Sequence, residues 1–212
     1  EIDALKTIIS TIPENSGMAF LVIEHLGEQQ HDNATALLEP LAKIPVIEIV
    51  NSVDLFPNHI YVIPHSNFLV YENSTLKLKP FNRSHKTNCC FDTFFEALSQ
   101  KFESYTVGLL LTWSSADGAS GLKKIKEVGG ATICTVTKVA YSVQKGSVEF
   151  IDFFTAPEKT AATLLDIKNS YNAIQAYHET QTLQEEKVYQ NIIDLMVQKK
   201  GTDFHQYKNE TM

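Results

Sequence analysis

The sequence MAFLVIEH, at residues 18–25, joins an unbroken apolar run to a histidine. The run from Met18 to Ile23 has the length and composition of a buried parallel strand. His25 follows where the chain must turn into the next element. In an open parallel α/β sheet, ligands bind beyond the carboxyl ends of the strands, so His25 is placed for proton transfer near neutral pH. The alternative is a histidine that only bonds a nearby carbonyl, and this run by itself favours that alternative.

A second strand end brings a carboxylate into consideration. The run TVGLLLT at residues 106–112 predicts another buried strand, and WSSADG at 113–118 leads into a helical pattern over residues 119–128. Asp117 therefore lies in a short loop before a helix, whose N-terminus favours an ionised carboxylate. A carboxylate that stays charged and reaches a histidine is the orienting half of a Ser-His-Asp arrangement. Asp117 as a simple cap of the following helix is the equally weighted alternative.

Composition limits the classes of function. The 212 residues are 43% hydrophobic, enough for one good core plus an appendage. The net charge of −7 disfavours nucleic acid or an anionic membrane as partner, and without an apolar run of 18 residues no membrane insertion is expected. Three cysteines without ligand spacing indicate reduced thiols and a cytoplasmic protein. Nucleotide-binding and metal motifs are missing, so no cofactor and no metal are expected.

Strand and helix patterns alternate along the chain up to residue 155. This alternation predicts an α/β fold with a doubly wound, mostly parallel, three-layer Rossmann-like sheet. Residues 68–72 and 75–79 predict a β-hairpin with Glu72-Asn73-Ser74 at its turn. The predicted strands are 18–23, 45–50, 60–64, 106–112, 131–137 and 148–154, and the predicted helices are 5–12, 33–42, 91–102 and 119–128.

The pattern becomes helical after Pro157. We expect one helix over 158–176, a polar joint over 178–182, and a second helix over 184–200 that Gly201 ends. The second helix has one apolar stripe, and an isolated helix of that length is marginal in water. A homodimer through this C-terminal helix is therefore expected, or else poor order, and packing back onto the sheet domain is the alternative. The stripe consists of Tyr189, Ile192, Ile193, Met196 and Val197.

Several segments together resemble the catalytic domain of CheB, the chemotaxis receptor methylesterase, over about residues 1–160. They are EIDALK at residues 1–6, PENSGMAF at 13–20 with EHL at 24–26, PNHIYVIP at 57–64, FDTFFEAL at 91–98, and SADG at 115–118 with GL at 121–122 and GG at 129–130. Each of these segments alone would be a weak indication of the family, but together they are specific for it.

The tail adds a second resemblance. GTDFHQYK at residues 201–208 is similar to the start of the small helical domain of CheR, the opposing methyltransferase. Because proteins that fuse the two in this order exist, the resemblance implies three parts: a CheB-like domain at residues 1–156, a helical linker at 157–183, and the beginning of a CheR-like domain at 184–212. The rest of the CheR-like domain would follow in the full-length protein.

The CheB resemblance implies hydrolysis of glutamate methyl esters on chemoreceptor helices through an acyl-serine intermediate. His25 would be the general base and Asp117 would hold its imidazole. Ser114 and Ser115 would belong to the loop that helps form the oxyanion hole. The family's nucleophilic serine, at the end of its first strand, should precede Glu1, so this chain is expected to be inactive by itself.

The chain also departs from the family pattern. Trp113, Ser114 and Ser115 replace the family's Gly-Met-Gly, and the family's D-G-M-P segment is missing between Thr137 and Ser147. Two hypotheses follow: a methylesterase whose serine lies upstream, or a degenerate non-catalytic signalling and docking module. Nucleotide binding is disfavoured because the glycine fingerprint is missing.

Overall fold

A computed structural model describes residues 2–23, 34–64, 67–80, 90–111, 117–136 and 148–200, with the side chains of the last helix described as far as residue 191. The chain forms two compact units, residues 1–167 and residues 168–212. Within the described ranges, no helix is both long enough and apolar enough to cross a bilayer.

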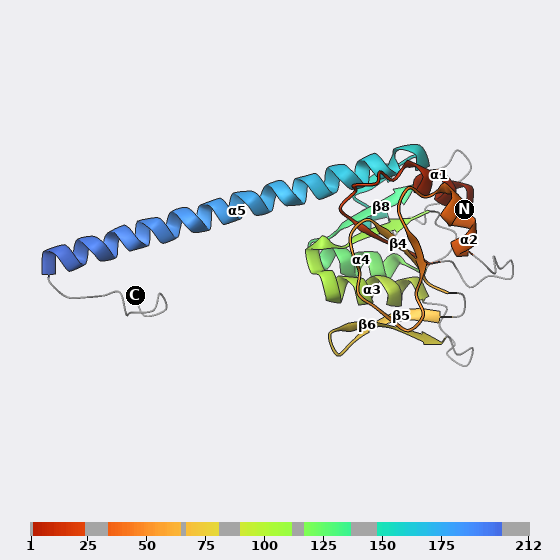
Figure 1. Ribbon diagram of the computed structural model, residues 1–212, viewed down its shortest axis with the longest axis horizontal. Coiled ribbons are helices and arrows are strands. Elements are labelled where there is room, and N and C mark those ends of the chain that lie inside the picture. The colour runs from red at the N-terminus through yellow and green to blue at the C-terminus, as the bar shows by residue number, and fades with distance from the viewer. Residues whose placement is uncertain are drawn as a thin grey trace. The chain divides into compact units, whose positions relative to one another are not determined.

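The parallel strands of the first unit form two three-stranded sheets (Figure 1). One sheet has the order β1 (Ala19–Val22), β4 (His59–Val62), β2 (Val46–Glu48). The other has the order β7 (Val107–Leu110), β8 (Ala131–Thr135), β9 (Phe153–Thr155). Every pair in these sheets is parallel. The predicted α/β class with parallel strands is confirmed, although the strands do not pair into one continuous sheet within the described residues.

Helices cover both faces of the parallel strands. Successive side chains of a strand point to opposite faces of the sheet, and apolar side chains on both faces need a covering layer. Val22, Ile60 and Val62 contribute to a core with α1 (Ile2–Thr11), α2 (Ala34–Leu38) and Ala161 near the start of α5 (Pro157–Lys200). Their neighbours in sequence, such as Tyr61 and Ile63, contribute to a second core with α3 (Cys90–Phe102) and α4 (Ala119–Glu127). The predicted three layers are therefore present.

A small antiparallel sheet packs on the outer side of α3 (Figure 1). Its order is β3 (Ser52–Val53), β6 (Thr75–Pro80), β5 (Asn67–Glu72). Glu72 pairs with Thr75, and Asn73 and Ser74 between them both have positive φ, 52° and 63°. Two positive φ values are what a type I′ hairpin turn needs, so the predicted hairpin and its turn are confirmed.

Two predicted elements differ from the structure. The predicted helix over 33–42 is divided into α2 and the 3-10 helix η1 (Glu39–Leu41), since Pro40 lacks the amide that a continuing α-helix needs. The predicted strand over 148–154 begins instead with the 3-10 helix η3 (Val148–Phe150). The Asp152 amide then donates to Thr132 Oγ1 at 3.0 Å and the Thr132 carbonyl at 3.1 Å, so regular pairing starts only at Phe153.

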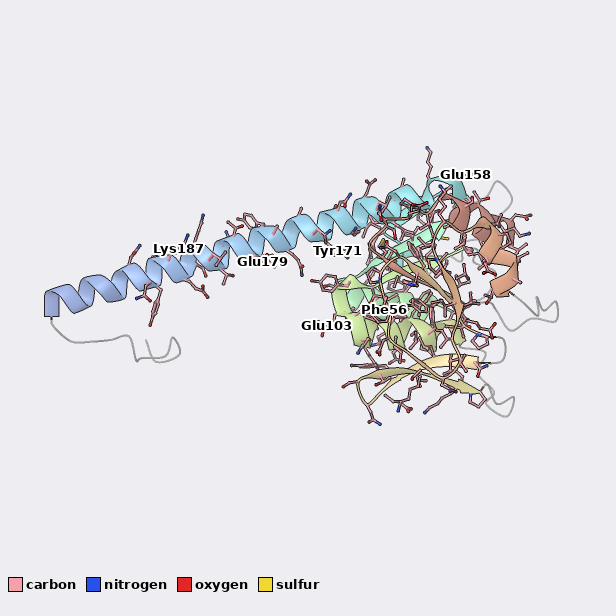
Figure 2. All side chains as sticks on the ribbon, in the orientation of Figure 1. Phe56, Glu103, Glu158, Tyr171, Glu179 and Lys187 are labelled. Atoms are coloured by element: carbon pink, nitrogen blue, oxygen red, sulfur yellow. The ribbon has the colours of Figure 1, made fainter. Side chains whose placement is uncertain are left out.

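The predicted polar joint at 178–182 is wrong, because α5 is one continuous helix from Pro157 to Lys200. No glycine or proline occurs between residues 158 and 200. The hydroxyls of Thr180 and Thr182 donate to the carbonyls four residues back, at 2.8 and 3.0 Å, which satisfies them inside the helix. Side chains on this part of α5 are mostly exposed, including Glu179 and Lys187 (Figure 2).

Candidate functional site

Of the residues predicted for the site, Asp117 lies within the described residues. His25, Ser114 and Ser115 lie outside them. Asp117 follows the end of β7 in sequence and immediately precedes Gly118, the N-cap of α4. The structure therefore shows which groups the Asp117 carboxylate contacts. Its pairing with His25 stays a prediction.

The Asp117 carboxylate holds the first amides of α3. Oδ2 accepts a hydrogen bond from the Phe91 amide at 3.1 Å, and Oδ1 accepts one from the Asp92 amide at 3.0 Å. These donors belong to the first turn, where backbone amides have no partner within the helix. Asp117 thus caps α3, a helix that lies before it in the chain.

The cap of α4 comes from α3 in return. Asp92 Oδ1 accepts from the Gly118 amide at 3.0 Å and from the Gly121 amide at 2.7 Å. Gly118 itself has φ 99°, a left-handed value that favours glycine, and offers no side-chain cap. The two helices therefore exchange capping carboxylates.

The two helices that cap each other, α3 and α4, also pack closely. A Cβ added to Gly121 would lie 2.7 Å from Phe95 Cβ and 3.0 Å from Asp92 Cα. Since real Cβ atoms do not approach other atoms that closely, the α3–α4 contact requires glycine at residue 121. The first turns of the two helices lie near enough for each carboxylate to reach the other helix.

The paired carboxylates affect each other electrostatically. Burial raises the pKa of the Asp92 carboxyl above its ordinary value, and the negative charge of Asp117 raises it further. The Gly121 and Gly118 amides act in the opposite direction, because they stabilise the charged form. The net result is a raised pKa for Asp92.

Capping α3 leaves Asp117 able to orient a histidine. An ionised carboxylate has about four acceptor lone pairs on its two oxygens, and the α3 amides occupy one on each oxygen. Asp117 can therefore accept from α3 and from an imidazole N–H together. The capping and catalytic interpretations of Asp117 are compatible.

Asp92 was missed by the sequence analysis. Its position in the first turn of a predicted helix was a signal for a capping interaction, but nothing local names Gly118 and Gly121 as its partners. Within the described ranges no group of three or more His, Cys, Asp or Glu side chains could hold a metal ion.

Comparison with known proteins identifies the family. A family profile described as CheB methylesterase matches residues 1–147. A Leptospira interrogans protein, named for protein-glutamate methylesterase and protein-glutamine glutaminase activity, is 31% identical over 133 residues, which cover 62% of this chain and 69% of that protein. The chain belongs to the CheB methylesterase family.

Two further comparisons agree. Protein-glutamate methylesterase/protein-glutamine glutaminase 4 of Geobacter metallireducens is 29% identical over 131 residues, which cover 61% of this chain and 38% of that protein. The crystal structure of the Thermotoga maritima CheB methylesterase catalytic domain superposes with a TM-score of 0.67 at 20% identity, covering 78% of this chain and 92% of that one. This structural similarity extends the agreement to the fold.

Proposed function

We propose that this chain is the CheB-like part of a chemotaxis-type signalling protein and hydrolyses glutamate methyl esters on receptor helices once its nucleophile is supplied. The family match over residues 1–147 carries this proposal. The fixed carboxylate of Asp117 supports it, because a triad needs an orienting group that is itself held in place.

The proposed reaction uses a Ser-His-Asp mechanism. His25 would remove the proton from a serine hydroxyl as that oxygen attacks the ester carbonyl, while Asp117 holds the imidazole. Backbone donors of the loop with Ser114 and Ser115 would stabilise the oxyanion. Methanol leaves with the proton from His25, water then hydrolyses the acyl-serine, and glutamate is released. A glutamine side chain would react likewise with loss of ammonia, which is the second activity in the relatives' names.

The edges of the two parallel sheets support a nucleophile strand upstream of α1. Leu21 of β1 and Leu110 of β7 contribute to one core, and Val22 and Leu111 to the other, yet β1 and β7 do not pair among the described strands. Phe20 and Leu109 on these strands are only partly buried, whereas parallel sheets normally bury both faces. A parallel strand between β1 and β7, followed by α1 in a right-handed crossover, would complete one sheet.

Labelling with a serine-directed fluorophosphonate tests this function. We expect no adduct on the 212-residue chain, since loss of a nucleophile leaves only residual catalysis. A longer protein with the residues upstream of Glu1 should be labelled at one upstream serine and should release methanol from methylated receptor. His25→Ala in that protein should abolish both signals. Labelling of the 212-residue chain would contradict the expected inactivity.

The alternative is a non-catalytic docking module, which the replacement of the family's Gly-Met-Gly by Trp113, Ser114 and Ser115 favours. A longer protein with no upstream serine, or one that binds receptor without releasing methanol, would establish this alternative in place of the esterase.

The remaining parts of the protein are proposed from the same resemblance. Residues 1–156 would be the CheB-like domain, 157–183 the linker and 184–212 the start of a CheR-like domain, with the cytoplasm as the compartment where receptor helices are methylated. The continuity of α5 through residue 183 supports a helical linker. Sequencing beyond Met212 tests the fusion, because a CheR-like domain should follow.

The second unit would associate with a second copy of the chain. Ile174 and Val188 are 53% and 58% exposed, so apolar side chains of this helix lie in water. An apolar stripe of this length needs a partner to be stable in water.

A further inference from the structure

The Asp92 carboxylate contacts backbone next to the proposed catalytic residue Asp117 and takes no part in the proposed reaction. It contacts the amides of Gly118 and Gly121, at 3.0 and 2.7 Å. Gly118 is the residue directly after Asp117. Whatever fixes the Gly118 amide therefore fixes the peptide unit from which the Asp117 side chain extends.

The contacts close into a ring. From Asp92 Oδ1 the path crosses to the Gly118 amide, continues through the backbone to Asp117, and returns from Asp117 Oδ1 to the Asp92 amide at 3.0 Å. A ring of this kind restricts both side chains, because neither carboxylate can rotate without breaking a bond to the other helix. The contact of Gly121 with Phe95 holds the two helices at the distance that the ring needs.

Both charges lie at positive ends of helices. The N-terminus of α3 faces the carboxylate of Asp117, and the N-terminus of α4 faces that of Asp92, an arrangement that stabilises anions. The two negative charges nevertheless oppose each other. Backbone amides hold each carboxylate in place against this repulsion.

We propose that Asp92 is a positioning residue for Asp117: its carboxylate anchors the start of α4 and so sets the direction in which the Asp117 carboxylate is presented to His25. The link to His25 rests on the proposed function. The positioning of Asp117 rests on the ring and is testable by itself.

Two substitutions separate the parts of this role. Asp92→Asn keeps an Oδ1 acceptor for the Gly118 and Gly121 amides and removes the negative charge, whereas Asp92→Ala removes both. Asp152→Ala is a matched control, since Asp152 Oδ2 also accepts from a backbone amide, that of Thr132 at 2.9 Å, in the same unit.

Hydrogen exchange of the Phe91 amide is the primary measurement. Asp117, not Asp92, accepts from this amide, so its exchange reports the position of Asp117. In Asp92→Ala we expect it to exchange about tenfold or more faster, the equivalent of losing one hydrogen bond to a charged group. Asp92→Asn and Asp152→Ala should each leave it within about threefold of the wild-type rate, because both keep the acceptors of the ring and the first turn of a helix exchanges by local opening rather than by global unfolding.

Each outcome decides the proposal. Wild-type exchange at Phe91 in Asp92→Ala would overturn positioning by Asp92. Equal acceleration in Asp152→Ala would also overturn it, because the effect would then be a general loss of stability.

A second measurement extends the proposal to catalysis. In a longer protein that releases methanol, Asp92→Ala should lower kcat by about 100-fold, as expected for a misplaced catalytic group, and Asp92→Asn should restore most of it. Unchanged kcat would remove the link to His25. A protein that releases no methanol would fail the proposed function while the exchange result stands.

Discussion

Thr132 and Asp152 bond each other in both directions. The amide and hydroxyl of Thr132 donate to Asp152 Oδ2, at 2.9 and 2.8 Å, and the Asp152 amide donates to Thr132 Oγ1 at 3.0 Å. Thr132 is fully buried on β8, so this pair ties the segment before β9 to the sheet. Lys126 from α4 adds an ion pair to Asp152 Oδ1 at 2.8 Å.

Asp152→Ala should destabilise the protein by about 1–3 kcal/mol, since the buried Thr132 donors lose their charged acceptor. Urea unfolding at neutral pH would measure the change. Glu127→Ala is the control: it removes the exposed ion pair with Lys124 and should leave the stability almost unchanged. Equal effects of the two substitutions would contradict the buried role of Asp152.

Acid should weaken the same contact. Burial tends to raise the pKa of Asp152, but hydrogen bonds from Lys126 and Thr132 outweigh it and lower the pKa below its ordinary value of 3.8. A lowered pKa in the folded state contributes stability that is present above pH 3.8 and is lost as the pH falls through the lowered pKa. The stability difference between wild type and Asp152→Asn should therefore shrink on acidification in that range. A constant difference would contradict it.

The contribution of Asp92 to stability should change with pH in the opposite direction to that of Asp152. Its pKa is raised above 3.8 in the folded protein, so its contribution to stability is complete below pH 3.8 and is lost as the pH rises through the raised pKa. Relative to Asp92→Asn, which has no titrating carboxyl, the wild type should lose stability over that interval. Thermal unfolding of both proteins across acidic pH would measure this, and parallel curves would rule it out.

Gly121→Ala should cost about 1–3 kcal/mol through overpacking, because the new methyl group meets Phe95 and the Asp92 backbone. Ser120→Ala changes the neighbouring, exposed position of α4 and should stay within about 0.5 kcal/mol. Chemical unfolding of both variants checks the prediction. A Gly121→Ala protein as stable as Ser120→Ala would mean that α3 and α4 separate at little cost.

Charge on the α5 stripe should dissociate the proposed dimer. Ile193→Glu should give a monomeric mass by light scattering, and so should removal of residues 178–212. Thr180→Glu is the matched control: it adds the same charge at an exposed residue that lies about 140° around the helix from Ile193, so the dimer should persist. A monomeric wild type with residues 178–191 protected from hydrogen exchange would exclude the dimer.

Elements of the fold that depend on the local pattern of residues were predicted correctly. Apolar runs located β1 and β7, and Asn73-Ser74 located the hairpin turn. The joint at 178–182 was wrong because a polar stretch was taken as a break in the helix, whereas threonine hydroxyls in it bond the helix's own carbonyls. The partners of Asp92 were missed because they lie 26 and 29 residues away, and only the packing of α3 on α4 brings them together. The pairing of His25 with Asp117 stays a prediction.

Helix α3 joins the candidate site to the hairpin. Its first turn is bonded to Asp117, and near its other end Lys101 Nζ donates to the Ser74 carbonyl at the hairpin turn, at 2.8 Å, and lies 5.5 Å from the centre of the Tyr71 ring. A helix this short moves as a rigid rod. A ligand that displaces Asp117 would therefore shift the hairpin. In turn, a partner that binds the hairpin would change the position of Asp117 and so the reactivity of the site.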